Sequence, residues 1–175
     1  MESGTVYAST YESPIGPLYV AVTQDGVVRV GLPYEASGEN GSGRTSTNGA
    51  ARWVWEDPPE HSAPAVDALR RYFEGDGDAF RGLPLAPHGT PFQMAIWQSC
   101  AEIPFGKTVT YGDLAAKAGR PGAARAVGGA MNRNPLPLIV PCHRVVGSGG
   151  DLTGYGMGGL GVKRWLLEHE GRNGD

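Results

Sequence analysis

The segment at residues 134–146, NPLPLIVPCHRVV, constrains the fold of this chain more than any other stretch. Its prolines, at positions 135, 137 and 141, exclude a helix or a central strand. Proline has no backbone N–H for either structure, and its ring blocks the preceding helical turn. The residues between the prolines are too apolar for a surface loop. We therefore expect a rigid, buried segment that delivers Cys142 to a fixed position.

Length and composition bound the class of protein. The chain has 175 residues, 40% of them hydrophobic, which is enough for one domain or two small ones with a real core. No apolar run approaches the roughly 18 residues of a membrane span, and the N-terminus does not resemble a secretory signal. The two cysteines form neither a disulfide framework nor a CxxC metal pair. We expect a cytoplasmic protein with free thiols, no bound metal and no cofactor.

The charge is unevenly distributed along the chain. The net charge is −3, yet residues 1–88 hold six Lys or Arg against twelve Asp or Glu, whereas residues 89–171 hold eight against five. Between residues 106 and 145, six basic residues face the single acidic Asp113. A polyanion responds to this local field rather than to the total charge. We therefore predict an N-terminal domain at 1–88 and a basic C-terminal domain at 89–175.

The N-terminal half reads as strands followed by a helix. TVYAST, PLYVAV and VVRVGL are rich in β-branched and aromatic residues and are separated by the turn signals SPIGP and QDG, which predicts a small antiparallel sheet. A helix is expected from a capping Ser62 to Gly75. Residues 35–50 are rich in Gly, Ser and Thr and are expected to form a flexible loop.

The C-terminal half opens with helices. Thr90 is expected to cap the first helix, with Pro91 at its first position and Gln93 completing a capping box. Two shorter helices are expected next. The first is capped by Thr110 and Asp113, which are three residues apart, and reaches Ala118. A glycine-containing turn joins it to the second, which runs from Pro121 through Met131. This is the outline of a helix-turn-helix, although ordinary helical hairpins share it.

The second of these short helices has an unusual surface. It exposes almost only alanine and glycine, and Gly128 and Gly129 each cost about 1 kcal/mol relative to alanine inside a helix. A helix with so low a profile can approach a DNA groove closely, and Arg125, its one long cation, can enter the duplex. The alternative is close packing against another helix, with Arg125 merely solvated.

The two cysteines differ in their surroundings. Cys100 falls on the apolar face of the helix that begins at Pro91 and is expected to be an inert core residue. Cys142 needs a base or a positive charge to become a thiolate. His143 is adjacent, but neighbouring side chains of an extended chain point to opposite sides, so a direct contact is not guaranteed and a bridging water would relieve that geometry. Glu170, on the apolar face of the final predicted helix, is a candidate to orient the imidazole.

PCHRV, preceded by RAVGGAMNRNP and followed by LTGY and LLEHEG, resembles the O6-alkylguanine-DNA alkyltransferases, also called methylated-DNA-protein-cysteine methyltransferases. FQMAIWQSCAEIPFGKTVTYGDLA and SPIGPL extend the similarity over nearly the whole chain. The resemblance implies an α/β fold, with a small antiparallel-sheet N-terminal domain and a mostly helical C-terminal domain containing the helix-turn-helix. It also implies single-turnover repair of double-stranded DNA bound through its minor groove. The alkyl group of a flipped O6-alkylguanine would pass irreversibly to Cys142, without a cofactor. We expect a monomer, with assembly on DNA as the alternative.

The resemblance also implies roles for individual residues. Cys142 would accept the alkyl group, His143 would act as base through water, Glu170 would orient His143, and Asn134 would brace the turn. DNA contacts are expected from Tyr111, Gly112, Arg120, Arg125 and Ser148. The guanine pocket is expected to be lined by Tyr111, Met131, Val145, Tyr155 and Gly156. Arg125 would fill the space left by the flipped base. The segment YGMGGLGVK is one residue longer than the family pattern, which bears on the pocket loop at 156–159.

Other functions use some of the same residues. A Cys-His hydrolase would share the dyad, but it would need an oxyanion site and would leave the basic Ala/Gly helix unexplained. Zinc could bind Cys142, His143 and His169, although adjacent residues are poor joint ligands. A non-catalytic sensor of alkylated DNA is a further alternative. The related sensor proteins have lost the cysteine, so the presence of Cys142 argues against this function.

Overall fold

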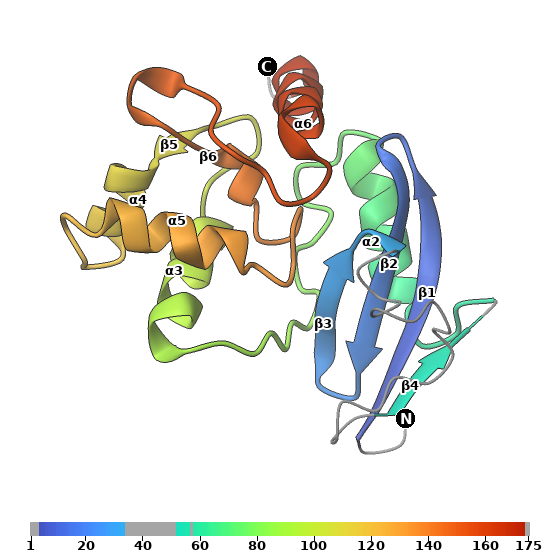
Figure 1. Cartoon of the computed structure of the whole chain (residues 1–175). Helices are drawn as coiled ribbons and strands as arrows, with labels where there is room; N and C mark the ends of the chain where they lie inside the picture. Colours follow the sequence, from blue (N-terminus) through green and yellow to red (C-terminus); the bar gives the residue numbers. More distant parts are fainter. Residues whose placement is uncertain (1–3, 34–51, 57, 174–175) are drawn as a thin grey trace. The chain divides into compact units, whose positions relative to one another are not determined.

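The computed structural model describes residues 4–33, 52–56 and 58–173. The chain divides into two compact units, Met1–Pro87 and His88–Asp175, coloured blue to green and green to red in Figure 1. The loop predicted at residues 35–50 lies outside the described residues. Each unit has its own core, and each is described separately below.

The first unit is built on a four-stranded sheet with the order β3-β2-β1-β4 (Figure 1). The strands are β1 (Thr5–Ser13), β2 (Gly16–Thr23), β3 (Gly26–Gly31) and β4 (Arg52–Trp55). Strands β1, β2 and β3 form the predicted antiparallel meander. Strand β4 was not predicted and runs parallel to β1, with Thr5 opposite Arg52. Its four residues are too few for an alternating pattern, so only pairing with β1 defines it.

Helix α2 (Ala63–Phe73) packs against one face of this sheet. On that face Tyr7 stacks on His61 with ring centroids 3.8 Å apart, and the hydroxyl oxygens of Ser9 and Ser62 are 2.5 Å apart. The prediction that Ser62 caps α2 through its side chain is wrong, because its hydroxyl is bonded to Ser9 instead. Leu18, Val20 and Val22 of β2 lie on this same face, and alternation along the strands places a second apolar cluster on the opposite face. That cluster contains Val6, Ala8, Tyr19 and Ala21, with Val28, Trp53 and Trp55 packed against it.

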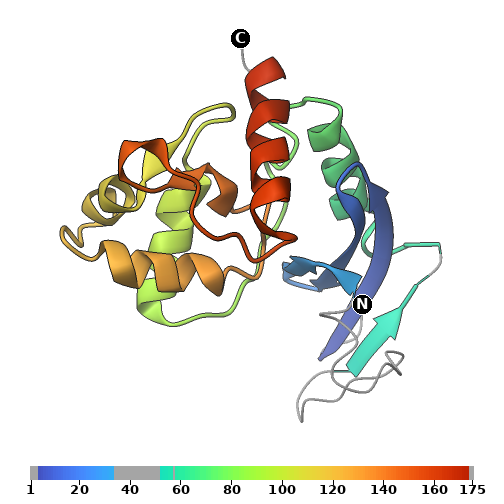
Figure 2. The ribbon, with the colours of Figure 1, turned by 45° about the horizontal axis from the view of Figure 1, so that its top comes forward.

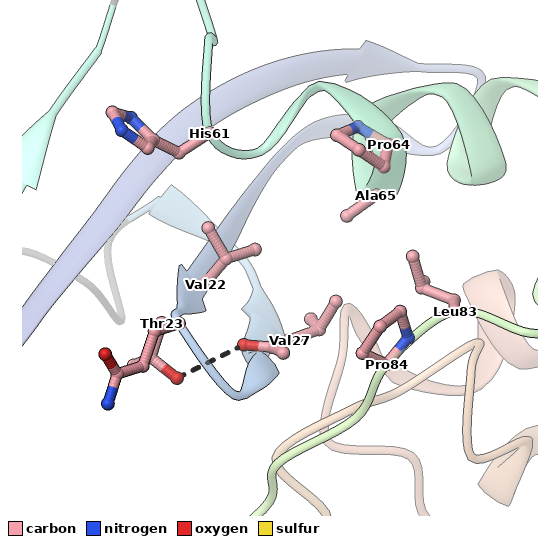
Figure 3. Close-up of a pocket in the computed structure, with 10 residues that line it drawn as sticks. Val22, Thr23, Val27, His61, Pro64, Ala65, Leu83 and Pro84 are labelled. Atoms are coloured by element: carbon pink, nitrogen blue, oxygen red, sulfur yellow. Dashed lines mark hydrogen bonds between the residues drawn. The ribbon is translucent and has the colours of Figure 1, made fainter. Parts of the chain in front are cut away.

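A pocket of about 160 Å³ lies in this unit beside the β2–β3 turn (Figure 3). The start of α2 and the segment containing Leu83 and Pro84 form its other walls. Gly26 adopts a φ of +136° here, and a Cβ at this position would overlap the carbonyl group of Pro84. The walls are mostly apolar, with Thr23 and His61 among the few polar residues.

The second unit begins with helix α3 (Pro91–Ala101). The predicted capping box is confirmed: Gln93 N donates to Thr90 Oγ1 at 3.2 Å, and Thr90 N donates to Gln93 Oε1 at 2.9 Å. Trp97 is buried, and its Nε1 donates to the carbonyl of Ala130 at 2.9 Å, which ties α3 to α5 (Ala124–Asn132). Burial of the apolar side chains around this hydrogen bond stabilises the packing of the two helices.

Strand β5 (Val109–Thr110) leads directly into α4 (Tyr111–Lys117), and α5 (Ala124–Asn132) follows after a turn. Thr110 and Asp113 form the predicted capping box of α4, and Gly119, with φ of +72°, follows the end of that helix. The prediction that the second helix starts at Pro121 is wrong, because α5 begins at Ala124. Gly122 has a φ of +82°, a left-handed conformation that no right-handed helix accommodates.

The rest of the unit forms around a short turn, η2 (Cys142–Arg144), followed by β6 (Val145–Val146) and η3 (Ser148–Gly150). Helix α6 (Gly159–Asn173) packs on η2 (Figures 1 and 2). Strands β5 and β6 pair in parallel, with Val109 opposite Val145. This ladder fixes the start of α4 beside the segment that follows Cys142. Among the described residues, no helix is long and apolar enough to cross a membrane.

Candidate active site

The proline-interrupted segment is buried, as predicted from the sequence. Leu136, Leu138, Ile139 and Val140 are each at most 7% exposed. Leu138 has a φ of +74°, a conformation that a branched residue adopts only when its surroundings impose it. Val140 N donates to Leu136 O at 2.8 Å, which closes the segment into a compact loop.

Asn134 links both ends of this loop. Its Nδ2 donates to the carbonyl of Val140 at 2.8 Å, and its Oδ1 accepts from the backbone N–H of Leu136 at 2.9 Å. One amide side chain therefore satisfies a donor and an acceptor of a backbone that forms neither helix nor sheet. The loop delivers Cys142 two residues after the braced carbonyl.

Cys142 occupies the first position of a single 3₁₀ turn. Cys142 N donates to Val140 O at 2.8 Å, and Arg144 N donates to Pro141 O at 2.9 Å. The extended conformation assumed from the sequence is therefore wrong, because Pro141 begins a turn instead. Side chains of neighbouring residues in a 3₁₀ turn still diverge by about 120°, so Cys142 and His143 project in different directions.

The thiol of Cys142 is partly buried. Burial raises its pKa, whereas a hydrogen bond from Asn134 and the positive charge of Lys163 act in the opposite direction. A thiol in this position is largely protonated at neutral pH and needs a base to release its proton. Cys100, in contrast, is completely buried in the core on α3, and burial raises its pKa far above the usual range.

His143 and Glu170 form a fully buried pair. His143 Nε2 lies 2.6 Å from Glu170 Oε1, and neither side chain is exposed. An ionised carboxylate only accepts hydrogen bonds, so Nε2 carries the hydrogen and Nδ1 of a neutral imidazole is left as the basic nitrogen. The predicted orientation of His143 by Glu170 therefore has a geometric basis, although the sequence could not give the distance.

Arg144 is a member of this site that sequence reasoning missed. Its Nε donates to Glu170 Oε2 at 2.8 Å and its Nη2 to Glu170 Oε1 at 2.9 Å, a bidentate pair. Its Nη1 donates to Ile103 O at 2.6 Å, and Gly106 N donates to Glu170 Oε2 at 3.2 Å. Hydrogen bonds from His143 and Arg144 outweigh burial and hold the pKa of Glu170 far below its usual range.

Lys163 is a second residue that the sequence reasoning did not assign. It is fully buried, and its Nζ donates to Val145 O at 2.7 Å and to Thr153 O at 3.2 Å. Burial lowers its pKa. Helical spacing was the available signal, because Lys163, Leu166 and Glu170 are related by three and seven positions and so share the buried face of α6.

The expected DNA contacts lie on the surface. Arg120, Arg125, Gly112 and Ser148 are exposed, and α5 presents Arg125 beside half-buried glycines. Tyr111 is half-buried, and its hydroxyl accepts from Thr153 Oγ1 at 2.9 Å, which links α4 to the segment before Tyr155. In the part of the chain that the structure describes, these three polar side chains make no hydrogen bond to the buried site residues His143, Arg144, Lys163 and Glu170. The three are Arg120, Arg125 and Ser148.

The residues expected to line the guanine pocket differ in how exposed they are. Val145 and Met131 are buried, and the ring of Tyr155 is edge-on to His143 with centroids 6.5 Å apart. Gly156 is exposed. Gly158, in the loop with the extra residue, has a φ of +85°, and a Cβ there would meet Val162 at 2.7 Å. Glycine is therefore required at this point of the loop.

The zinc alternative finds no support in this geometry. Within the described ranges, no three His, Cys, Asp or Glu residues gather where they could hold a metal ion. Nε2 of His143 is engaged by Glu170, and the ring of His169 stacks on Trp165 with centroids 5.1 Å apart.

Comparison with known proteins identifies the class. Residues 6–87 match the ribonuclease-like domain of 6-O-methylguanine DNA methyltransferase, and residues 91–172 match the DNA binding domain of the same family. A methylated-DNA–protein-cysteine methyltransferase of Methanosarcina acetivorans is 42% identical over 166 residues, which cover 95% of this chain and 99% of that protein. The protein of that name in Haemophilus influenzae is 38% identical over 165 residues, which cover 94% of this chain and 86% of that protein.

Solved structures agree with this result. The crystal structure of Mycobacterium tuberculosis OGT in complex with DNA matches with a TM-score of 0.80 and 39% identity, covering 95% of this chain and 94% of that chain. The crystal structure of the O6-methylguanine-DNA methyltransferase of Pyrococcus kodakaraensis matches with a TM-score of 0.62 and 26% identity, covering 95% of this chain and 99% of that chain. The chain therefore belongs to the 6-O-methylguanine DNA methyltransferase family of DNA-repair proteins. The resemblance drawn from PCHRV is confirmed.

Proposed function

We propose that this chain repairs DNA by transferring the alkyl group of O6-alkylguanine to the Sγ atom of its own Cys142. The observation that carries the proposal is the placement of a single partly buried thiol directly before the buried His143–Glu170 pair, at the end of a loop braced by Asn134. The names of the relatives support this chemistry, since they are methylated-DNA–protein-cysteine methyltransferases.

The reaction begins with removal of the thiol proton. Nδ1 of His143 takes the proton of Cys142 through a bridging water, and Glu170 holds the imidazole in the tautomer that leaves Nδ1 basic. The thiolate then attacks the alkyl carbon. The S–C bond forms as the C–O6 bond breaks, and its electron pair stays on guanine, which takes up the proton. The products are guanine and an S-alkylcysteine, so each molecule reacts once.

DNA is bound by the α4–α5 pair. Helix α5 enters the minor groove because its exposed surface is nearly free of side chains, and Arg125 takes the place of the guanine that leaves the stack. Tyr111, at the first turn of α4, lies beside the path of the flipped nucleotide. Arg120 and Ser148 contact the phosphate backbone, where a cation and a hydroxyl fix register without reading sequence.

The flipped guanine enters a pocket next to Cys142. Val145, Tyr155 and Gly156 approach it from the segment after the nucleophile, and Met131 contributes from α5. All of these residues, and all of the catalytic ones, come from residues 88–175 of one chain. A monomer therefore holds every group that the reaction uses.

The intact mass of the protein after incubation with a duplex containing one O6-methylguanine tests the proposal. We expect the mass to rise by one methyl group and then stop, with the methyl group mapped to the peptide containing Cys142. Binding to the duplex without any mass change would indicate a sensor instead. Turnover of a thioester or peptide, with no binding, would indicate a Cys-His hydrolase.

A further inference from the structure

The carboxylate of Glu170 is shared by two cationic or potentially cationic side chains. Oε1 lies 2.6 Å from His143 Nε2 and also accepts from Arg144 Nη2 at 2.9 Å, while Oε2 accepts from Arg144 Nε at 2.8 Å. Gly106 N completes the set at 3.2 Å. Glu170 is therefore fully occupied by donors, and Arg144 alone supplies a full compensating charge.

The Arg144 guanidinium is itself held in place. Its Nη1 donates to Ile103 O at 2.6 Å, its Cζ lies 5.6 Å from the centroid of the Phe105 ring, and the residue is only 7% exposed. The Phe105 ring is in turn edge-on to His169, with centroids 6.4 Å apart. Arg144 cannot leave Glu170 without losing these contacts, so the ion pair is a fixed part of the site.

A buried histidine beside an unpaired carboxylate would take up a proton, because the ion pair formed is more stable than an isolated buried anion. Such an imidazolium has no basic nitrogen and cannot accept the thiol proton. With Arg144 neutralising Glu170, the carboxylate still accepts the Nε2 hydrogen bond but no longer requires a positive imidazole. Burial is the main cause of the lowered pKa of His143, and Arg144 and Lys163 add to it, whereas Glu170 acts in the opposite direction.

We propose that Arg144 is a positioning residue for the alkyl transfer: its bidentate pair with Glu170 keeps His143 neutral, with the hydrogen on Nε2 and the lone pair on Nδ1. This inference rests on the proposed function, because it concerns the base in that reaction. The charged or titratable groups that surround His143 are Cys142 and Arg144 in η2 and Lys163 and Glu170 in α6, with Tyr155 edge-on from the preceding loop. Of these, only Arg144 touches both carboxylate oxygens of Glu170.

The pH dependence of Cys142 alkylation by excess free O6-benzylguanine tests this role without DNA. We expect Arg144→Met to move the acid limb of the profile upward by about one pH unit or more, because His143 then stays protonated to higher pH. The rate at pH 6.5 should fall about tenfold or more relative to the wild-type protein, whereas at pH 9 the two rates should agree within about threefold. Arg144→Lys retains the charge and should retain most of the wild-type profile.

Two further measurements separate this role from simple loss of structure. Arg164→Met removes an exposed arginine from α6 and should leave the profile unchanged. In the wild-type protein, ¹⁵N chemical shifts of the His143 ring should report the neutral Nε2–H tautomer at pH 7. An imidazolium at that pH, or an equal loss of rate at every pH in Arg144→Met, would overturn the proposal. Failure of the wild-type protein to be alkylated at all would instead overturn the proposed function.

Discussion

Glu170 Oε1 lies 2.6 Å from His143 Nε2, although 27 positions separate the two residues in the chain. The last helix thus supplies the carboxylate, and the turn after the proline-rich loop supplies the imidazole. Both side chains are fully buried, where electrostatic interactions are strong and an unmatched charge is costly. Helix α6 is therefore part of the site rather than a cover over it.

Cys142→Ser should abolish transfer while DNA binding persists. Serine keeps the shape of the turn, but a hydroxyl is a far weaker nucleophile than a thiolate. The measurement pairs intact mass with a binding titration on a duplex containing O6-methylguanine. Methyl transfer to another residue of this variant would show that Cys142 is not the acceptor.

Arg125→Ala should weaken transfer from duplex DNA and leave the reaction with free O6-benzylguanine largely intact, because a free base needs no flipping. We expect a loss of about tenfold or more on the duplex, equal to a loss of about 1.4 kcal/mol or more. Arg133→Ala, which removes an exposed cation at the end of the same helix, controls for the loss of charge alone. Equal losses on both substrates would refute the role given to Arg125.

Glu170→Gln should destabilise the fold by about 3–5 kcal/mol at neutral pH, because the buried Arg144 loses its counter-charge. The folded state lowers the pKa of Glu170, so its contribution is complete above the ordinary value of about 4.3. That contribution is lost as the pH falls toward the lowered value. Urea unfolding should be measured from pH 7 to pH 3. The difference in the free energy of unfolding between the variant and the wild-type protein should become smaller below about pH 4. Glu168→Gln, at an exposed position of α6, should change stability by less than about 0.5 kcal/mol.

Asn134→Ala should cost about 1–3 kcal/mol of stability, because the N–H of Leu136 loses its acceptor and the carbonyl of Val140 keeps only the hydrogen bond from Cys142 N. It should also slow methyl transfer, since the loop positions Cys142. Asn132→Ala, two residues earlier and exposed, provides the matched comparison. If both variants transfer at the wild-type rate, Asn134 is structural only.

The two thiols should differ in reactivity toward iodoacetamide. Cys100 is completely buried and its pKa is raised far above the usual range, so only unfolding exposes a reactive form. We expect peptide mapping after brief treatment at pH 8 to find the label on Cys142 with Cys100 unmodified. Labelling of Cys100 at a comparable rate would contradict the core position assigned to it.

Local signals predicted well wherever a few adjacent residues decide the structure. The capping boxes at Thr90 and Thr110 were predicted from spacing alone, because the bonded groups are three residues apart. The same logic failed at Ser62, where a hydroxyl from β1 competes for the cap, and at Pro121, where the left-handed Gly122 delays the helix. The bond of Ser62 to a distant strand and the left-handed backbone of Gly122 are not part of the local patterns that predict a helix start.

The sequence by itself determined the family, the nucleophile candidate, the buried proline-rich loop and the amphipathic pattern of the elements, because each depends on residues close together in the chain. Only the tertiary structure decided the bidentate contact of Arg144 with Glu170, the clamp of Lys163 on the segment after Cys142, and the parallel pairing of β5 with β6. Each of these joins residues from separate elements, and a buried charge has no fixed partner until the fold brings one within hydrogen-bond distance.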